Sequence, residues 1–495
     1  MKLMRLIDNF IDGSWQSPDS SNRAPNINPA DTRETIAEAP LSTSVDVAEA
    51  VKAAERAFPG WRATPAPKRG HLLYRVQRKM EERRNELAEA LTREEGKTLT
   101  ESHGEVQRAI NVVEFFAAES RRIIGETIPS EFPNNFCYTV REPVGPLALI
   151  TPWNFPVAIP MWKLAPAIAC GNTVVLKPAS LTPLSAALIA EIFNECDTPA
   201  GVLNIVYGSG RNVGEPLVAH PSIKGVSFTG SNDVGAGLYG TGAARGIKCQ
   251  CEMGGKNPII VLEDADLDLA VNSAIQGAYG STGQRCTATS RAVVVDSIAD
   301  AFVERVEERV NALVVGNGLE PETDVGPSVD KQQLETVLDF INIGQEEGAQ
   351  LITGGKLLAT EMHKHGFFIE PSLFDHVTSD MRIAQEEIFG PVLSVLRVPD
   401  TATALSVAND VRYGLTASIY TRDISKALTF TDKLQVGIVH VNSPTVGGEA
   451  HVPFGGMKAT GVGLREMGRE AIAFFTELKV VYWDYTGSDR KGNLY

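Results

Sequence analysis

Apolar residues recur at helical spacing over much of the first 120 positions. Val47, Val51, Ala54 and Phe58 follow one another three or four residues apart within residues 44–58, which is the period of an amphipathic helix. The same period continues over residues 68–93 and 102–122, so the sequence predicts three helices in succession. Residues 1–40 instead carry turn signals and predict short surface hairpins.

From residue 146 onward, short apolar runs alternate with helical segments. The predicted strands are 147–150, 173–176, 202–206 and 226–228, with helices over 159–169 and 183–194 between them. The rhythm resumes at 258–261 and continues to 439–442. Such alternation is typical of βαβ units and predicts two α/β domains with open parallel sheets, joined near residues 254–255.

Two further segments are rich in strand-forming residues but stand outside this rhythm, around residues 130–144 and 478–485. We expect them to pack together as a bridging unit. The second segment has no neighbouring strand in the sequence, and unpaired strand edges invite association. We therefore expect it to pair across the interface of a homo-oligomer, a dimer or a tetramer.

The composition limits the classes of partner. The 495 residues are 43% hydrophobic and 22% charged, which is ordinary for a globular protein of about three domains. A net charge of −15 argues against nucleic acid or anionic lipid as a partner. No apolar run approaches the ~20 residues of a membrane span, and no secretory signal is present, so we expect a cytoplasmic protein that binds small molecules. The six cysteines lack metal-ligand spacing, and no metal is expected.

Two motifs carry candidate chemistry. Cys286 lies in the glycine-rich stretch GSTGQRCT at residues 280–287, where a thiol can face a cleft, although a lone cysteine is more often structural. Glu252 ends a predicted strand directly before two glycines, at the edge where open α/β sheets keep their sites. Taken alone, Glu252 is equally typical of a solvated loop.

Four more motifs lie at the ends of predicted strands: three follow a strand, and the fourth precedes one and is, taken alone, equally typical of an ordinary acidic turn. They are TPWNFP at 151–156 with Asn154, LKPAS at 176–180 with Lys177, FTGSNDVG at 228–235, and QEEIFGPV at 385–392 with Glu387. The third opens a helix, and helix N-termini bind phosphate groups.

In this order and at these separations, the six motifs resemble the aldehyde dehydrogenase superfamily over nearly the whole chain. The family motif Glu-Leu-Gly-Gly-Lys reads here with Met253 for Leu, and Cys286 follows Glu252 by 34 residues, as in the family. The resemblance implies an α/β aldehyde dehydrogenase-like fold of two Rossmann-like domains plus a small β bridging domain. The implied parts are a cofactor-binding domain at 1–127 and 147–254, a catalytic domain at 255–470, and bridging segments at 128–146 and 471–495.

The resemblance also implies roles for the catalytic residues. Cys286 would add to the aldehyde as a thiolate, and the Asn154 amide with the Cys286 N–H would stabilise the oxyanion. Glu252 would activate the water that hydrolyses the thioester, helped by a pKa raised through burial. Lys163 matches a family lysine near the active site whose charge helps to stabilise the thiolate; the alternative is a solvated helix lysine.

The implied cofactor is NAD or NADP. The GxGxxG fingerprint is absent, and Gly230 with Ser231 would meet the pyrophosphate instead. By the same resemblance, Trp153 would touch a phosphate, Lys177 the adenine ribose and Glu387 the nicotinamide ribose, with Phe389 beside the ring. Ser180 stands where many NAD-specific members carry a glutamate, which removes a charge that would repel a 2′-phosphate.

The candidate substrate residues are Arg108, Phe155, Arg285 and Phe454. Two guanidinium groups in one funnel predict an anionic aldehyde. Arg108 would be the weaker contact if it lies nearer solvent, and the alternative for Arg108 is an exposed helix residue. The motifs look most like those of bacterial α-ketoglutarate semialdehyde (2,5-dioxopentanoate) dehydrogenases. Succinate semialdehyde or another carboxylated or phosphorylated aldehyde is the alternative. Glu252 argues against a coenzyme A-acylating member, and the intact motifs argue against a catalytically idle one.

Overall fold

The computed structural model describes residues 4–487, and its largest element is an eight-stranded sheet in the order β22-β12-β11-β8-β9-β10-β2-β3. Its five central strands are parallel, and β22, β2 and β3 join the edges in antiparallel pairing. The bounds are β2 (Asn9–Ile11), β3 (Ser14–Gln16), β8 (Pro146–Ile150), β9 (Thr173–Lys177), β10 (Leu203–Ile205), β11 (Gly225–Thr229), β12 (Lys248–Glu252) and β22 (Gly461–Val462).

Helices cover both faces of this sheet because its strands are buried on both sides. Along β8, Leu147 and Leu149 enter one hydrophobic core, while Ala148 and Ile150 enter the other. One face carries α1 (Ser44–Ala63), α7 (Glu215–Ala219) and α8 (Asn232–Ala244). The other carries α5 (Ala158–Cys170) and α6 (Pro183–Glu195), with α2 (Ala66–Glu82), α3 (Arg84–Glu95) and α4 (Leu99–Glu119) around them.

The single helix expected over 68–93 is wrong, because the chain breaks at Arg83 into α2 and α3. The Arg83 guanidinium reaches out to Glu191 and Glu195 on α6, at 2.6 and 2.9 Å. These ion pairs are long-range contacts that the local apolar period does not reveal.

A second, seven-stranded sheet is parallel except at its edge strand β15, so both α/β sheets that the sequence predicts are present. The order is β15 (Gln350–Thr353), β16 (Ser372–Asp375), β17 (Val392–Val398), β14 (Thr289–Val295), β13 (Asn257–Val261), β19 (Thr416–Tyr420) and β20 (Ile438–Val441). One face carries α9 (Leu267–Tyr279) and α10 (Asp296–Asn311), and the other α11 (Lys331–Glu346), α12 (Arg382–Gln385), α13 (Thr401–Asn409) and α14 (Ile424–Lys433).

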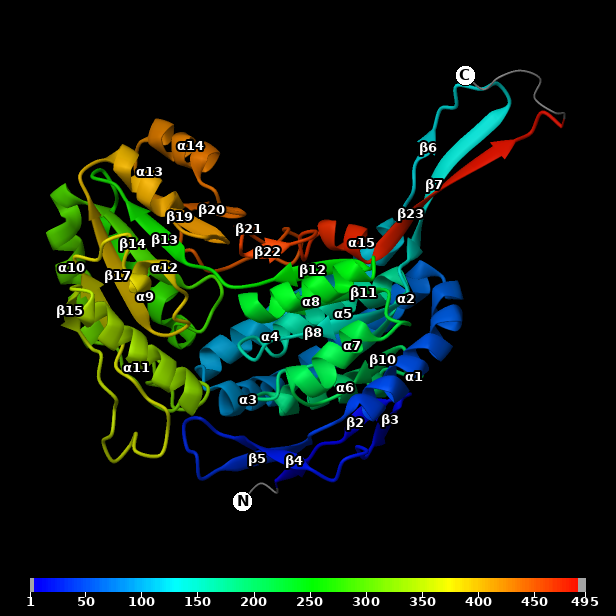
Figure 1. The fold of residues 1–495 in the computed structure, drawn as a ribbon, viewed down its shortest axis with the longest axis horizontal. Coiled ribbons are helices and arrows are strands. Elements are labelled where there is room, and N and C mark those ends of the chain that lie inside the picture. The colour runs from blue at the N-terminus through cyan, green and yellow to red at the C-terminus, as the bar shows by residue number, and fades with distance from the viewer. Residues whose placement is uncertain (1–3, 488–495) are drawn as a thin grey trace.

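A three-stranded arm of β6 (Thr127–Ile128), β7 (Asn135–Pro143) and β23 (Thr476–Asp484) projects from the body (Figure 1). β23 pairs antiparallel with β7 along its whole length, so the expected packing of these two segments is confirmed. The first partner of the C-terminal strand is therefore in its own chain. The outer edge of β23 has no partner strand among residues 4–487.

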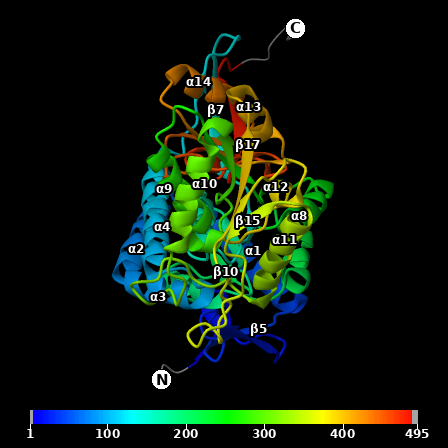
Figure 2. The same cartoon turned by 90° about the vertical axis from the view of Figure 1, so that its left-hand side faces the viewer.

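The small sheet of β1 (Arg5–Leu6), β4 (Arg23–Ile27) and β5 (Thr35–Pro40) lies at the end of the molecule opposite the arm (Figure 2). The remaining short elements are β18 (Tyr413–Gly414), β21 (Met457–Lys458) and α15 (Glu470–Phe474). Across the described residues, no helix is both long enough and apolar enough to traverse a bilayer.

Candidate active site

A cavity of about 230 Å³ lies at the carboxyl ends of β8, β11 and β12, where the two sheet domains meet. The chain leaving β8 supplies Trp153 and Asn154, and the chain leaving β11 supplies Gly230 and Ser231. Carboxyl ends of parallel strands are the usual place for a ligand site in such sheets. The lining residues are Pro152, Trp153, Asn154, Ile159, Thr229, Gly230, Ser231, Met253, Gly254, Cys286, Gln333, Glu387 and Phe389.

Cys286 enters this cavity from a tight turn after α9. Ser281 and Thr282 in that turn have left-handed backbone angles, with φ of 48° and 58°. Gly283, also at positive φ, packs so closely on the Gly390 carbonyl that a Cβ would clash. Burial, together with the Glu387 and Glu252 carboxylates, raises the pKa of the Cys286 thiol to about 12, while Arg108 acts in the opposite direction.

Asn154 lines the same cavity as the Cys286 thiol, and hydrogen bonds hold both its side-chain amide and its backbone carbonyl. Its Nδ2 donates one hydrogen to the Gln284 carbonyl at 3.0 Å, which leaves the second amide hydrogen free for a ligand. Its own backbone carbonyl accepts a hydrogen bond from the buried Lys97 ammonium at 2.6 Å. The amide is therefore held rigidly at the cavity wall.

Glu252 ends β12 and is buried behind the cavity wall. Its Oε2 has no hydrogen-bond partner among residues 4–487, and its Oε1 lies against Gly455 and Gly461. Burial, and then the nearby Glu466 carboxylate, raise the pKa of Glu252 well above its usual value. This carboxyl is a proton acceptor of unusually high affinity, as the sequence analysis expected of it.

The structure does not bring Lys163 to the thiol. The Lys163 ammonium forms a buried ion pair with Glu466 and donates to the Ser227 hydroxyl at 2.8 Å. The charge of Lys163 is therefore paired between α5 and β11. Arg108 is the cation that lowers the pKa of the Cys286 thiol.

Five of the seven predicted cofactor residues line the cavity. Trp153 and Phe389 meet edge to face, with ring centroids 5.3 Å apart. Glu387 accepts a hydrogen bond from the Gly255 N–H at 2.9 Å, and burial raises its pKa to about 7. Gly230 and Ser231 sit at the N-terminus of α8.

Lys177 and Ser180 lie outside this lining. The Lys177 ammonium donates to the Pro178 carbonyl at 2.9 Å, and burial lowers its pKa to about 8. Ser180 is exposed, and its hydroxyl donates to the Gly208 carbonyl at 3.1 Å.

The two predicted substrate arginines have different partners. Arg285 forms an ion pair with Glu101 at 3.1 Å and donates to the Ser281 hydroxyl at 2.7 Å. Arg108 forms no ion pair among the described residues; its guanidinium lies 3.6 Å from the Met467 sulfur, 5.4 Å from the centroid of the Trp162 ring, and against Gly448. Arg285 is thus ion-paired in the structure, whereas Arg108 has no ion pair in the described part of the chain.

The two candidate phenylalanines frame these arginines. The Lys97 ammonium lies 4.1 Å from the centroid of the Phe155 ring, and the Arg285 guanidinium lies 5.9 Å from the same centroid. Phe454 is buried and packs on Trp162 at 5.6 Å, the same ring that carries Arg108.

Lys97, Glu101 and Glu105 are site residues that the sequence analysis missed. Glu105 binds the Lys97 ammonium at 2.7 Å and accepts the N–H groups of Val157 and Ala158 at the start of α5. A signal was present, since Glu101, Glu105 and Arg108 are spaced four and three residues apart and so share one helix face.

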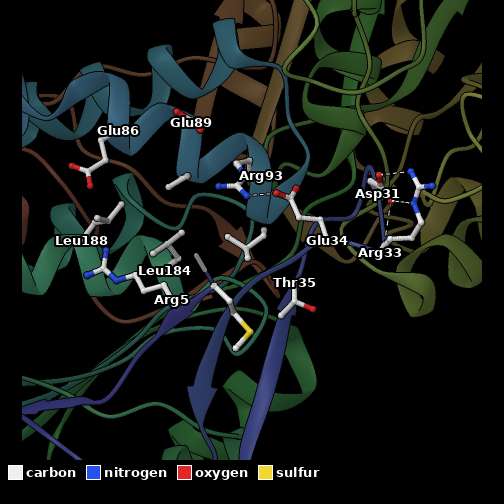
Figure 3. A pocket seen from close by; sticks show the side chains of 13 residues that line it. Arg5, Asp31, Arg33, Glu34, Thr35, Glu86, Glu89, Arg93, Leu184 and Leu188 are labelled. Atoms are coloured by element: carbon white, nitrogen blue, oxygen red, sulfur yellow. Dashed lines mark hydrogen bonds and ion pairs between the residues drawn. The ribbon is translucent and has the colours of Figure 1, made fainter. Parts of the chain in front are cut away.

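A larger hollow of about 730 Å³ lies between the N-terminal strands, α3 and α6 (Figure 3). None of the predicted site residues lines it. Its arginines already face carboxylates, with Arg93 on Glu34, Arg33 on Asp31 and Arg5 on Glu191. The smaller cavity is therefore the better candidate for the active site.

The sequence model of the Aldehyde dehydrogenase family matches residues 15–481. The chain belongs to the aldehyde dehydrogenase family. This aldehyde dehydrogenase is 44% identical over 474 residues to the alpha-ketoglutaric semialdehyde dehydrogenase of Bacillus subtilis (strain 168), covering 96% of this chain and 97% of the relative. It is also 44% identical over 480 residues to the 2,5-dioxopentanoate dehydrogenase of Saccharolobus solfataricus, covering 96% and 98%.

Solved structures agree with the fold. The betaine aldehyde dehydrogenase of Staphylococcus aureus, crystallised with NAD⁺, superposes with a TM-score of 0.95 at 35% identity, covering 97% of this chain and 95% of that one. The family and the fold expected from the six motifs are thus confirmed, and the protein is an NAD(P)-dependent aldehyde dehydrogenase.

Proposed function

We propose that this aldehyde dehydrogenase oxidises an aldehyde with a distal carboxylate, namely α-ketoglutarate semialdehyde to 2-oxoglutarate. The observation that carries the proposal is the Arg108 guanidinium, which is partly buried, has no ion pair with a carboxylate among residues 4–487, and acts electrostatically on Cys286. An unpaired buried cation is costly unless a ligand pairs with it. The 44% identity to two relatives named for this semialdehyde supports the choice of compound.

The chain's residues suit a dinucleotide in the cavity. Ser231 caps α8 without a side-chain hydrogen bond to the first turn, so backbone N–H groups there remain free for a pyrophosphate. Beside them, the Thr229 hydroxyl is buried and has no hydrogen-bond partner in the part of the chain that the structure describes. Gly254 lets the Glu387 carboxylate approach closely, since a Cβ there would clash with it. When bound, NAD(P) supplies the acceptor for the aldehyde's hydride.

Cys286 and Asn154 are proposed to carry out the acylation. The Cys286 sulfur forms a bond to the aldehyde carbon, and the carbonyl π electrons move onto oxygen. The free Asn154 amide hydrogen and the Cys286 N–H stabilise that oxyanion. Arg108, the cation that lowers the thiol pKa, favours the thiolate. Loss of hydride from the carbon then leaves a thioester on Cys286.

Glu252 is proposed to act in the second half-reaction. Its unpartnered Oε2 takes a proton from water, and the water oxygen attacks the thioester carbon. The carbon–sulfur bond breaks with its electron pair on sulfur, the acid leaves, and the proton held by Glu252 restores the thiol of Cys286. A base in this position favours hydrolysis over transfer of the acyl group to coenzyme A.

The assembly is proposed to be a homo-oligomer built on the arm. Val480, Tyr482 and Trp483 on β23 are 48, 68 and 63% exposed in the single chain. Apolar side chains along an unpaired strand edge favour addition to a neighbour's sheet. A dimer or tetramer would cover them.

A steady-state survey tests the substrate proposal. The enzyme is assayed with succinic, glutaric and α-ketoglutaric semialdehydes and with butanal, each with NAD and with NADP. We expect the highest kcat/KM for α-ketoglutaric semialdehyde and a much lower value for butanal. A kcat/KM for butanal that equals the semialdehyde values would overturn the proposal, whereas a preference for succinic semialdehyde would move it to that alternative.

A further inference from the structure

Lys97 and Arg285 lie over the Phe155 ring, and Arg108 lies over the Trp162 ring and acts electrostatically on Cys286. Two of these three cations already have carboxylate partners. Lys97 is paired with Glu105 at 2.7 Å, and Arg285 is paired with Glu101 at 3.1 Å. Glu95 also approaches Lys97, at 3.7 Å. Arg108 is therefore the one of these three cations that has no carboxylate within ion-pair distance in the described part of the chain.

Helix α4 determines which of these cations are neutralised. Glu101, Glu105 and Arg108 lie on the same face of α4, because their spacing of four and three residues matches the helical repeat. Glu101 and Glu105 neutralise cations from other segments, whereas Arg108 is the cation without an ion pair among the described residues. The pairing of these cations is thus controlled from α4.

Glu101 is held firmly in the position that neutralises Arg285. Its Oε2 accepts hydrogen bonds from the N–H and hydroxyl of Thr98, both at 3.1 Å, as part of the capping box of α4. Its Oε1 accepts the Ser281 N–H at 2.6 Å as well as Arg285. The carboxylate therefore cannot swing away from Arg285 without breaking the cap.

We propose that Glu101 is a specificity-determining residue that occupies Arg285 and restricts the substrate's distal group to a single negative charge, a carboxylate rather than a phosphate. This inference rests on the proposed function and names the charge that the same site accepts. A phosphate monoester carries about −1.5 to −2 at pH 7. It needs a second unpaired cation, which Glu101 withholds.

The variant Glu101→Gln removes the charge while keeping one oxygen, which can still accept the Ser281 N–H. The new amide NH2 takes the place of the oxygen that faces Thr98; it can donate to the Thr98 hydroxyl but cannot accept the Thr98 N–H. Arg285 is then left without its anion, and its side chain is 17% exposed, so an incoming anion can reach it. Two guanidinium groups match a dianion, and each ion pair strengthens in a partly desolvated site.

The experiment measures kcat/KM of the full-length enzyme for butanal, α-ketoglutaric semialdehyde and glyceraldehyde 3-phosphate, at neutral pH and fixed salt. Glu101→Gln is expected to raise the ratio of kcat/KM for the phosphate over that for butanal by about tenfold, mainly through KM. The ratio for the carboxylate is expected to rise less. The gain should shrink at about 1 M salt, where the Debye length is ~3 Å.

Two further variants isolate the cause. Glu114→Gln makes the same charge change at an exposed position of α4 and is expected to leave all three ratios unchanged. The double variant Glu101→Gln/Arg285→Leu is expected to lose the gain, because no second cation is present. Melting temperatures of all variants show whether each one folds.

The proposal is overturned if Glu101→Gln changes all three aldehydes by the same factor, since that pattern indicates support of the Cys286 turn. It is also overturned if the gain persists without Arg285. Failure of the proposed function gives a different result: the wild-type enzyme would then have a higher kcat/KM for butanal than for the semialdehyde. The change in the phosphate-to-butanal ratio between wild type and Glu101→Gln would still test the role of Glu101.

Discussion

Replacing Arg108 by leucine is the perturbation that bears most directly on substrate recognition. Around Arg108 the structure places the Met467 sulfur and the Trp162 ring, both of which tolerate an apolar side chain. Burial lowers the pKa of the guanidinium, which means that its charge is held at a cost. We therefore expect Arg108→Leu to fold and to be no less stable than wild type.

The loss of kcat/KM in Arg108→Leu can be estimated from the environment of Arg108. A substrate carboxylate left without its cation in a desolvated site costs roughly 2–4 kcal/mol, or about 30- to 1,000-fold in kcat/KM. Most of the loss should fall on KM, because the distal carboxylate is bound equally in the ground and transition states.

The assay compares α-ketoglutaric semialdehyde with butanal, and Arg285→Leu serves as the matched control. Arg285 is already neutralised by Glu101, so its loss should cost the semialdehyde several-fold less than the loss of Arg108. The thiol of Cys286 also loses a cation in Arg108→Leu, which raises its pKa, so kcat for both aldehydes should shift to higher pH. The reasoning is refuted if Arg285→Leu is the more damaging variant, or if KM for the semialdehyde does not change.

Other features lead to further expectations. Turnover should rise with pH across the neutral range, because the Cys286 thiol and the Glu252 carboxyl both have raised pKa values and must lose a proton; a kcat that falls over that range would contradict this. Ser180→Glu should raise KM for NADP more than for NAD, and equal effects would count against a role in cofactor choice. Lys97→Met should lower the unfolding free energy by about 3–5 kcal/mol by leaving buried Glu105 unpaired, measured by denaturant titration, with Lys97→Arg expected to lose less. Tyr482→Glu should reduce the mass seen by light scattering, and an unchanged oligomer would argue against the β23 edge.

The sheets could be predicted from the sequence because burial on both faces leaves a strong local pattern. Leu147 to Ile150 form a continuous apolar run, and in the structure alternate residues enter opposite cores. The arm was also predictable, since β7 and β23 are both rich in strand formers, although their mutual pairing joins segments more than 300 residues apart.

The ion pairs around the site could not be predicted from local sequence patterns. Arg285 stands beside Cys286 in the sequence, which made it the obvious substrate contact, but its partner Glu101 comes from a helix far upstream. Lys163 likewise matched a family position, and only the structure shows its ammonium bound to Glu466. Ion pairs depend on tertiary neighbours, whereas periodicity depends on the segment alone.

The account's central claim is that Cys286 forms a thioester with an anionic semialdehyde and that Glu252 hydrolyses it. The most direct measurement mixes the Glu252→Gln variant with NAD and α-ketoglutaric semialdehyde, follows the reduced cofactor by stopped flow, and then determines the intact protein mass. We predict a burst of one reduced cofactor per site and a mass increase equal to the acyl group, located on Cys286. A burst without a covalent adduct, or steady turnover at the wild-type rate, would contradict the account.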